Sequence, residues 1–220
     1  MSGRPAAGYR LKDGTRVPGT TTVAKLIDGG DIEGLLIWAN RLGQEGKDHR
    51  AERDAAASIG TLAHDMVEHH IKGHEYVPPP DMDRGKLGKA AKALEAYLAW
   101  ERRTRLKIIS TEVSLVSEAH RFGGTLDAIG EIDNELCLCD HKTSNSIYPA
   151  YLLQLVAYGK IWNENNPDRQ LVGGFHLLKY SKDHPDFSHH YYANLEHEWQ
   201  MFLHCLALYE GRKQIKKRAA

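Results

Sequence analysis

A β-hairpin signal in the middle of the chain constrains its fold most. The dipeptide Asp133-Asn134 favours a tight turn, and residues 123–132 and 135–142 on either side of it are rich in Leu, Ile, Thr and Cys. If the turn is centred on this dipeptide, counting outward along both strands places Asp127 directly opposite Asp140. Residues opposed in this way share one face of a sheet, so the sequence predicts two carboxylates side by side.

An opposed pair of carboxylates is a candidate metal site. Facing like charges destabilise a sheet unless a cation, protonation or solvent compensates them. Mg²⁺ prefers oxygen ligands and keeps several waters, one of which can attack a phosphodiester. Lys142 shares the face of Asp140, so its amine is placed to orient or deprotonate that water, or to neutralise charge in the transition state. The backbone carbonyl of His141 is a further candidate ligand.

The triplet Asp140-His141-Lys142 also has a plainer interpretation. An acid-x-Lys pattern is short, and Glu45-Gly46-Lys47 is a second example in this chain. A strand that runs into a polar loop would produce the same triplet. The opposed Asp127, which follows Gly123-Gly124-Thr125, favours a functional site instead.

Two predicted helices add polar residues to this set. Residues 55–72 carry an apolar stripe with His64 at its edge, and residues 149–163 carry Gln154 and Tyr158 one turn apart. A histidine at the edge of an apolar stripe is usually partly buried and hydrogen-bonded, and a tyrosine in such a place often belongs to the core. The pattern alone leaves the functional and the structural interpretation open for these residues.

Four short motifs occur in an order that resembles one enzyme superfamily. They are Gly-x-x-x-His, Gly-x-x-Asp, Asp-x-Lys and Gln-x-x-x-Tyr, which appear here as Gly60 to His64, Gly124 to Asp127, Asp140 to Lys142 and Gln154 to Tyr158. Together with the lead-in Val17-Pro18-Gly19-Thr20-Thr21-Thr22 and with Trp38, they resemble the RecB-like branch of the PD-(D/E)xK nuclease superfamily. That branch includes phage-type, mitochondrial genome-maintenance and CRISPR-associated exonucleases. The resemblance covers about residues 17–180, although Leu126 stands where the superfamily's name has proline.

The resemblance implies a role for each matched residue. The metal ligands would be His64, Asp127 and Asp140, and the catalytic lysine would be Lys142. Gln154 and Tyr158 resemble a helix pair that supports the site or touches DNA phosphate. Glu112, on the strand before the hairpin, resembles an auxiliary acid of some relatives; its alternative is a solvated or salt-bridged strand residue.

The resemblance also implies Mg²⁺ or Mn²⁺ as the cofactor, and we expect no iron–sulfur cluster. Many relatives hold such a cluster with four cysteines, whereas this chain has three, Cys137, Cys139 and Cys205. Two of them alternate along one predicted strand, which is poor geometry for a four-thiolate cluster. The odd number favours a reducing compartment over a disulfide framework.

The expected fold is α/β, a restriction-endonuclease-like mixed β-sheet flanked by α-helices, with a helical N-terminal region. We expect one nuclease domain over residues 1–220, with a helical part to about 105, a catalytic core over about 106–195 and a C-terminal helix over about 195–217. The predicted strands are 107–117, 121–132, 135–141, 170–180 and 187–193, and the other predicted helices are 20–27, 32–42 and 83–105, with Thr22 or Asp31 as helix caps.

Composition limits the partners of the chain. Its net charge is +0, so DNA binding would need a local basic surface, for which 102–107 and 212–218 are candidates. Trp38, Tyr148 and Tyr151 are candidates for stacking on unpaired bases, although single aromatic residues more often belong to the core. No secretion signal and no membrane-spanning run are visible, so we expect a protein of the cytoplasm of a bacterial or phage-infected cell.

These observations predict a metal-dependent DNA exonuclease that hydrolyses linear or single-stranded DNA in recombination, repair or DNA processing. Its expected partner is DNA, and other recombination proteins are candidate partners. Neither the polarity nor the oligomeric state follows from the sequence. An endonuclease or flap nuclease of the same fold is the nearest alternative. A non-catalytic DNA-binding or assembly module and a hydrolase of small phosphoesters are alternatives from other classes.

Overall fold

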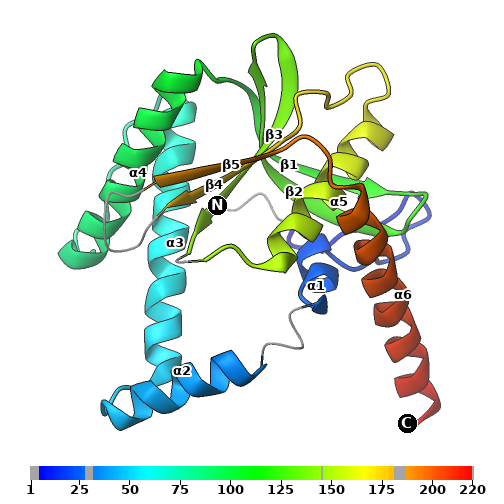
Figure 1. The fold of residues 1–220 in the computed structure, drawn as a ribbon, viewed down its shortest axis with the longest axis horizontal. Coiled ribbons are helices and arrows are strands. Elements are labelled where there is room, and N and C mark those ends of the chain that lie inside the picture. Colours follow the sequence, from blue (N-terminus) through cyan, green and yellow to red (C-terminus); the bar gives the residue numbers. More distant parts are fainter. Residues whose placement is uncertain (1–4, 28–31, 145, 181–186, 220) are drawn as a thin grey trace.

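The computed structural model describes residues 5–27, 32–144, 146–180 and 187–219, and it is built around one five-stranded sheet. The strands are β1 (Lys107–Ser117), β2 (Phe122–Ile132), β3 (Glu135–Thr143), β4 (Phe175–Tyr180) and β5 (Phe187–Tyr192). They lie in the order β1-β2-β3-β4-β5 (Figure 1). Among these five strands, β3 and β4 are the one parallel pair, because α5 (Pro149–Asn165) crosses over between them. The expected mixed sheet flanked by helices is thereby confirmed.

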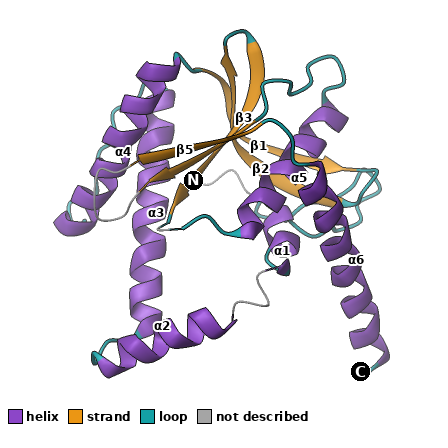
Figure 2. Cartoon of the chain, in the orientation of Figure 1, coloured by secondary structure: helices purple, strands orange, loops and turns teal. Residues whose placement is uncertain are grey.

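Helices cover both faces of the sheet (Figure 2). One face carries α3 (His49–Ile71) and α4 (Arg84–Thr104), which pack against each other. The other carries α1 (Thr20–Ala24), α5 and α6 (Glu196–Arg218). The remaining helix, α2 (Ile32–Gln44), contacts the end of α3. Among the described helices, none is both long enough and apolar enough to cross a membrane.

The central strand β3 divides the interior into two cores because its side chains alternate between the two faces. Leu138 belongs to the core under α1, α5 and α6. Cys137 and Cys139 belong to the core under α3 and α4. Asp140 and Lys142 therefore continue on the α5 side, and His141 on the side of α3 and α4, as the predicted hairpin register requires.

That register is confirmed at the turn. Ile132 pairs with Glu135, and Asp133 and Asn134 have φ values of 51° and 67°, the left-handed conformation that two-residue hairpins use. The strand expected over 170–180 begins only at Phe175. The residues directly before it have no regular structure, and the amides of Val172 and Gly173 donate to the Leu136 carbonyl of β3.

The helix expected over 20–27 ends at Ala24, and two expectations about helix starts are wrong. The helix that carries His64 begins at His49 rather than near residue 55, because the Asp48 side chain caps it by accepting from the Arg50 amide. Thr22 is not a cap, since it lies inside α1, whose N-cap is Gly19. Asp31, the other expected cap, lies outside the described residues.

Candidate active site

The candidate site lies where β2 and β3 separate. Their pairing ends at Ala128 and Cys139, one residue before Asp127 and Asp140 would oppose each other. Beyond this point β2 pairs with β1 and, through a single bridge at Gly123, with Gly19, whereas β3 pairs with β4. The Asp127 carboxylate bridges the opening strands, since its Oδ2 accepts a hydrogen bond from the His141 amide at 2.9 Å. The two acids are thus neighbours, as expected. The hydrogen bond to the Asp127 side chain takes the place of the next backbone pairing between β2 and β3.

Asp140 and Lys142 form an ion pair on the α5 side of the sheet. Asp140 is completely buried, and apart from this ion pair neither of its oxygens has a hydrogen-bond partner in the described part of the chain. Burial, offset in part by Lys142 and reinforced by Asp127, raises the pKa of Asp140 to about 7. Burial would lower the pKa of Lys142, but Asp140 and Asp127 hold it above its ordinary value. Among the described residues, the lysine cation is thus the one recorded polar partner of the buried Asp140 side chain.

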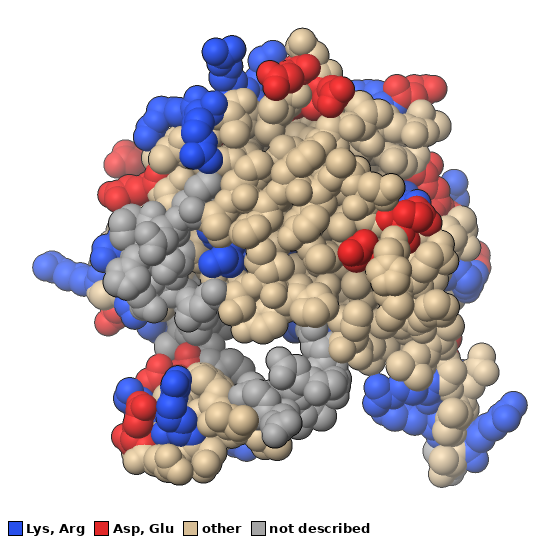
Figure 3. Space-filling model, viewed as in Figure 1, with Lys and Arg blue, Asp and Glu red and all other residues tan. Residues whose placement is uncertain are grey.

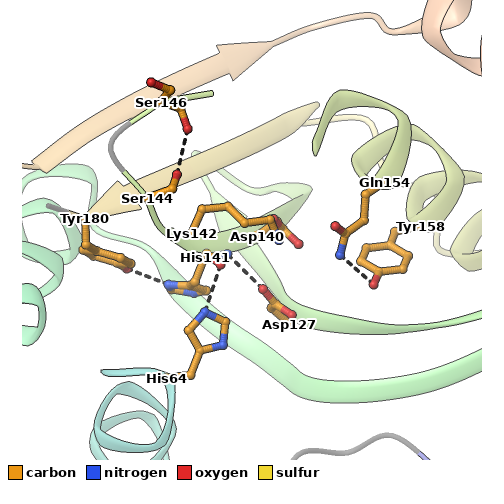
Figure 4. Close-up of polar contacts among 10 residues, drawn as sticks. All are labelled: His64, Asp127, Asp140, His141, Lys142, Ser144, Ser146, Gln154, Tyr158 and Tyr180. Carbon is orange, nitrogen blue, oxygen red and sulfur yellow. Dashed lines mark hydrogen bonds and ion pairs between the residues drawn. The ribbon is translucent and has the colours of Figure 1, made fainter. Parts of the chain in front are cut away.

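His64 reaches the same point from α3, on the opposite face of the sheet (Figure 4). Its Nε2 lies 2.9 Å from the His141 carbonyl oxygen, to which it donates. The single residue His141 thus connects Asp127 through its amide and His64 through its carbonyl. Burial would raise the pKa of Asp127, but Lys142, His64 and His141 outweigh it, so this pKa lies below its ordinary value.

Glu112 has an unusual backbone conformation. Five described non-glycine residues have a positive φ, and Glu112, with a φ of 52°, is the one inside a strand. Its neighbours Thr111 and Val113 pair with β2, and Glu112 interrupts this pairing opposite Asp127. It lines a small cavity together with Asp127, His64 and His141. Such backbone strain, on the order of 1–3 kcal/mol, is concentrated at functional sites. The role of Glu112 as an auxiliary acid stays a prediction.

Gln154 and Tyr158 lie one turn apart on α5, where Gln154 Nε2 donates to the Tyr158 hydroxyl at 2.8 Å. Both side chains are buried, Gln154 at 9% and Tyr158 at 4% exposure. Burial, with Asp127 and Asp140 nearby, raises the pKa of Tyr158, so this phenol is neutral. Their support of the site and their contact with DNA both stay predictions.

Tyr180 is a site residue that the sequence motifs missed. It lies on β4, and its hydroxyl is 2.6 Å from Nδ1 of His141, with the two rings stacked at 9°. Burial and the neighbouring His64 lower the pKa of His141 to about 3, so its imidazole is neutral. Parallel pairing of β3 with β4 brings Tyr180 beside the site. A single tyrosine in a predicted strand gives no local signal for this contact.

Replacing Tyr180 by Phe should loosen the site without removing a ligand. The buried Nδ1 of His141 would lose its partner, which costs about 1–3 kcal/mol, and the His141 peptide that connects Asp127 with His64 would be held less firmly. We expect a lower midpoint of urea unfolding, and a higher Mn²⁺ concentration for half-maximal thermal stabilisation.

Tyr97→Phe is the matched control for this change. It removes a hydroxyl in the same core, which donates to Glu101 at 2.7 Å and does not bond His141. Equal shifts in the Mn²⁺ requirement of the two variants would show that Tyr180 has no specific positioning role.

The donor chemistry at this point suits a divalent metal. Asp127, the buried Asp140 and the His141 carbonyl offer the oxygen ligands that Mg²⁺ and Mn²⁺ prefer, and His64 offers an imidazole. The orphaned oxygens of Asp140 are acceptors that a cation would satisfy. Among the described residues, however, no three His, Cys, Asp or Glu side chains already converge on one point. Metal binding would thus require His64 and Lys142 to give up their present contacts.

Comparison with known proteins yields similarity in structure only. No protein-family model matches the sequence, and a search of curated proteins finds no match either. A candidate exonuclease from Eubacterium rectale matches over 70% of this chain and 65% of its own, under two thirds of its length, with 12% identity and a TM-score of 0.49. The alkaline exonuclease LHK-Exo from Laribacter hongkongensis, also solved in complex with dAMP, matches over 73% of this chain and 86% of its own. Its two structures show 16% and 15% identity, each with a TM-score of 0.35.

In motif order and in sheet topology, this chain resembles the PD-(D/E)xK nucleases. The elements occur in the order that the resemblance implies: a hairpin with two acids and a lysine, then a helix with Gln154 and Tyr158, within a mixed sheet. All the TM-scores lie below 0.5 and the identities below 25%, so the roles of individual residues rest on the geometry of this chain.

Proposed function

We propose that this protein is a DNA exonuclease that depends on Mg²⁺ or Mn²⁺ and hydrolyses the phosphodiesters of linear or single-stranded DNA. The observation that carries the proposal is the buried ion pair of Asp140 and Lys142 next to Asp127, at the point where two strands separate and His64 arrives from the opposite face. Residues of three of the four sequence motifs thus lie close together. The exonucleases among the structural neighbours agree in kind with this proposal.

The metal ligands in the proposal are Asp127, Asp140, His64 and the carbonyl of His141. A divalent cation held there would neutralise phosphate charge and lower the pKa of a bound water. Asp140 and Asp127 hold the pKa of Lys142 above its ordinary value, so in the proposal Lys142 stays charged and stabilises charge on the phosphate oxygens rather than acting as a base. Glu112, facing the same cavity as Asp127, is placed to accept a proton from the attacking water or to orient it.

Positive charge for DNA binding is local, since the net charge of the chain is +0. Figure 3 shows Lys and Arg side chains gathered on the projecting end of α6. The exposed cations there are Arg212, Lys213, Lys216, Lys217 and Arg218. In the proposal this end of α6 contacts DNA phosphates, and such binding weakens as salt rises.

Digestion of labelled DNA tests the proposal. The substrates are end-labelled linear duplex, single-stranded DNA and closed circular DNA, each with Mg²⁺, Mn²⁺ or EDTA, for the wild type and Asp127→Asn. We expect metal-dependent loss of linear but not circular DNA, and a reduction of at least about 100-fold in the variant. Cutting of circles would make the protein an endonuclease. Absence of cutting by folded protein with either metal would refute the catalytic proposal.

A non-catalytic module that keeps the fold remains the second candidate, because no three side chains among those described are preassembled for a metal. Thermal unfolding with and without Mn²⁺ separates the two candidates. Metal that binds only the folded protein raises the unfolding temperature. We expect this rise in the wild type and its loss in Asp127→Asn, whereas a module without a metal site would show no rise in either protein.

A further inference from the structure

A line of aromatic rings leads from the candidate site to the surface. Lys142 Nζ lies 5.3 Å from the centroid of the Tyr151 ring, and the Tyr151 ring lies 5.4 Å from that of Tyr148 in a T-shaped contact. Tyr151 is partly buried, whereas 43% of Tyr148 is exposed. Tyr148 is thus a large aromatic side chain at the surface, separated from the candidate catalytic lysine by a single ring.

Helix formation does not account for a tyrosine at position 148. Tyr148 is the N-cap of α5, a position where Ser, Thr, Asp and Asn are preferred because their side chains accept from the first free amides. Tyr148 makes no such hydrogen bond. The start of the helix is set instead by Pro149, whose fixed φ suits the first turn. Capping therefore does not explain the Tyr148 ring. Its contact with Tyr151 explains only part of it, since 43% of the residue is exposed.

We propose that Tyr148 stacks on an unpaired nucleobase next to the scissile phosphate, so that the substrate of this site is the single-stranded end of a DNA chain. The inference rests on the proposed nuclease function and specifies its substrate class. Aromatic side chains bind single strands by stacking on base faces, which tolerates any sequence. In a duplex both faces of an internal base are already covered by neighbouring bases. A phosphate placed at Lys142 would have its base near Tyr148 only if that base had left the helical stack.

A fluorescent base reports the stacking directly. Single-stranded oligonucleotides that carry one 2-aminopurine, at successive positions from the end, are mixed with protein in EDTA so that nothing is cut. Stacking on an aromatic ring quenches this base. We expect quenching at one or two adjacent positions with the wild type and with Tyr148→Phe, and its loss with Tyr148→Ala. Binding of the same oligonucleotide should weaken on the order of tenfold in the alanine variant.

Tyr191→Ala provides the control, because Tyr191 is a comparably exposed tyrosine (53%) on β5, outside the candidate site. It should bind and quench as the wild type does. Two results would overturn the inference. One is equal quenching by the wild type and by Tyr148→Ala. The other is tighter binding of blunt duplex than of single strands by both of these proteins. Position-specific quenching by a protein that cuts no DNA would support the stacking site while refuting the catalytic proposal, so the two failures are distinguishable.

Discussion

Lys142→Met should strongly reduce DNA cleavage and make the stability of the protein depend more steeply on pH. Removing a cation that stabilises transition-state charge costs on the order of 100- to 1,000-fold in rate. The same change leaves the fully buried Asp140 without its ion-pair partner, and breaking a buried pair from one side destabilises a protein by about 3–5 kcal/mol. Methionine keeps most of the length of the lysine side chain, so packing against Tyr151 is largely retained.

The pH dependence has a definite sign. The pKa of Asp140 is raised to about 7 even with Lys142 present, mainly by burial, and an unfolded aspartate titrates near about 3.9. A group whose pKa is raised on folding favours the folded state at low pH and loses that contribution as pH rises through the folded pKa. Without Lys142 the pKa of Asp140 rises further. Urea unfolding should therefore show a larger stability loss in Lys142→Met at pH 8 than at pH 5.

The double variant Asp140→Asn/Lys142→Met is the matched control. It removes both charges, so the unpaired buried carboxylate and its pH dependence should disappear. Stability at pH 8 should return toward the wild-type value, while cleavage stays strongly reduced because a ligand and the cation are both missing. If the double variant is no more stable than Lys142→Met at pH 8, the ion pair does not govern the stability of this site.

The central hairpin was predictable because its register is a local property. Asp133-Asn134 sets a two-residue turn, and alternation along β3 then fixes which side chains face α5 and which face α3 and α4. That register alone predicts that Asp127 and Asp140 lie close to each other. Motif order added His64, whose helix the sequence also predicted, although only the fold shows that it meets the site through the His141 carbonyl.

Features that depend on contacts between distant segments were not predictable. Beyond Ala128, β2 stays paired with β1 and β3 with β4, and this separates β2 from β3. No turn residue in the sequence indicates where the separation begins. The positive φ of Glu112 contradicts ordinary glutamate preference and reflects the surrounding sheet. Tyr180 reaches His141 only because β4 pairs in parallel with β3. In each case tertiary structure overrides or adds to the local preference of the residue.

Gly124 shows how a motif residue can be required for packing rather than for chemistry. A Cβ atom at this position would lie 2.5 Å from Cε1 of Tyr158 and 2.8 Å from Oγ1 of Thr20. Thr20 in turn donates to the Gly123 carbonyl at 2.9 Å, so the start of α1 is packed directly on the first residues of β2. The missing side chain at Gly124 thus leaves the space that Thr20 occupies at the start of α1. This explains why the glycine before Asp127 and the Thr-rich N-terminal segment occur together.

Gly124→Ala should therefore destabilise the protein and impair the site. Neither contact can relax freely, because Tyr158 is buried against Gln154 and Thr20 is held by its hydrogen bond. Overpacking of this kind costs about 1–3 kcal/mol, measured as a lower urea midpoint at unchanged m-value. Displacement of Tyr158, which lies close to Asp127 and Asp140, should also lower cleavage.

Gly88→Ala gives the opposite expectation for the same chemical change. Gly88 lies inside α4, and nothing stands within 4 Å of a Cβ placed there. Alanine in a helix interior is more stable than glycine by about 0.5–1 kcal/mol, so this variant should unfold at higher urea and cleave DNA as the wild type does. Changes of the same sign in the two variants would contradict the steric account. Opposite signs would establish that the glycine of the Gly-x-x-Asp motif serves to seat α1 and Tyr158 beside the acids, and that the motif specifies the architecture of the site as well as its ligand.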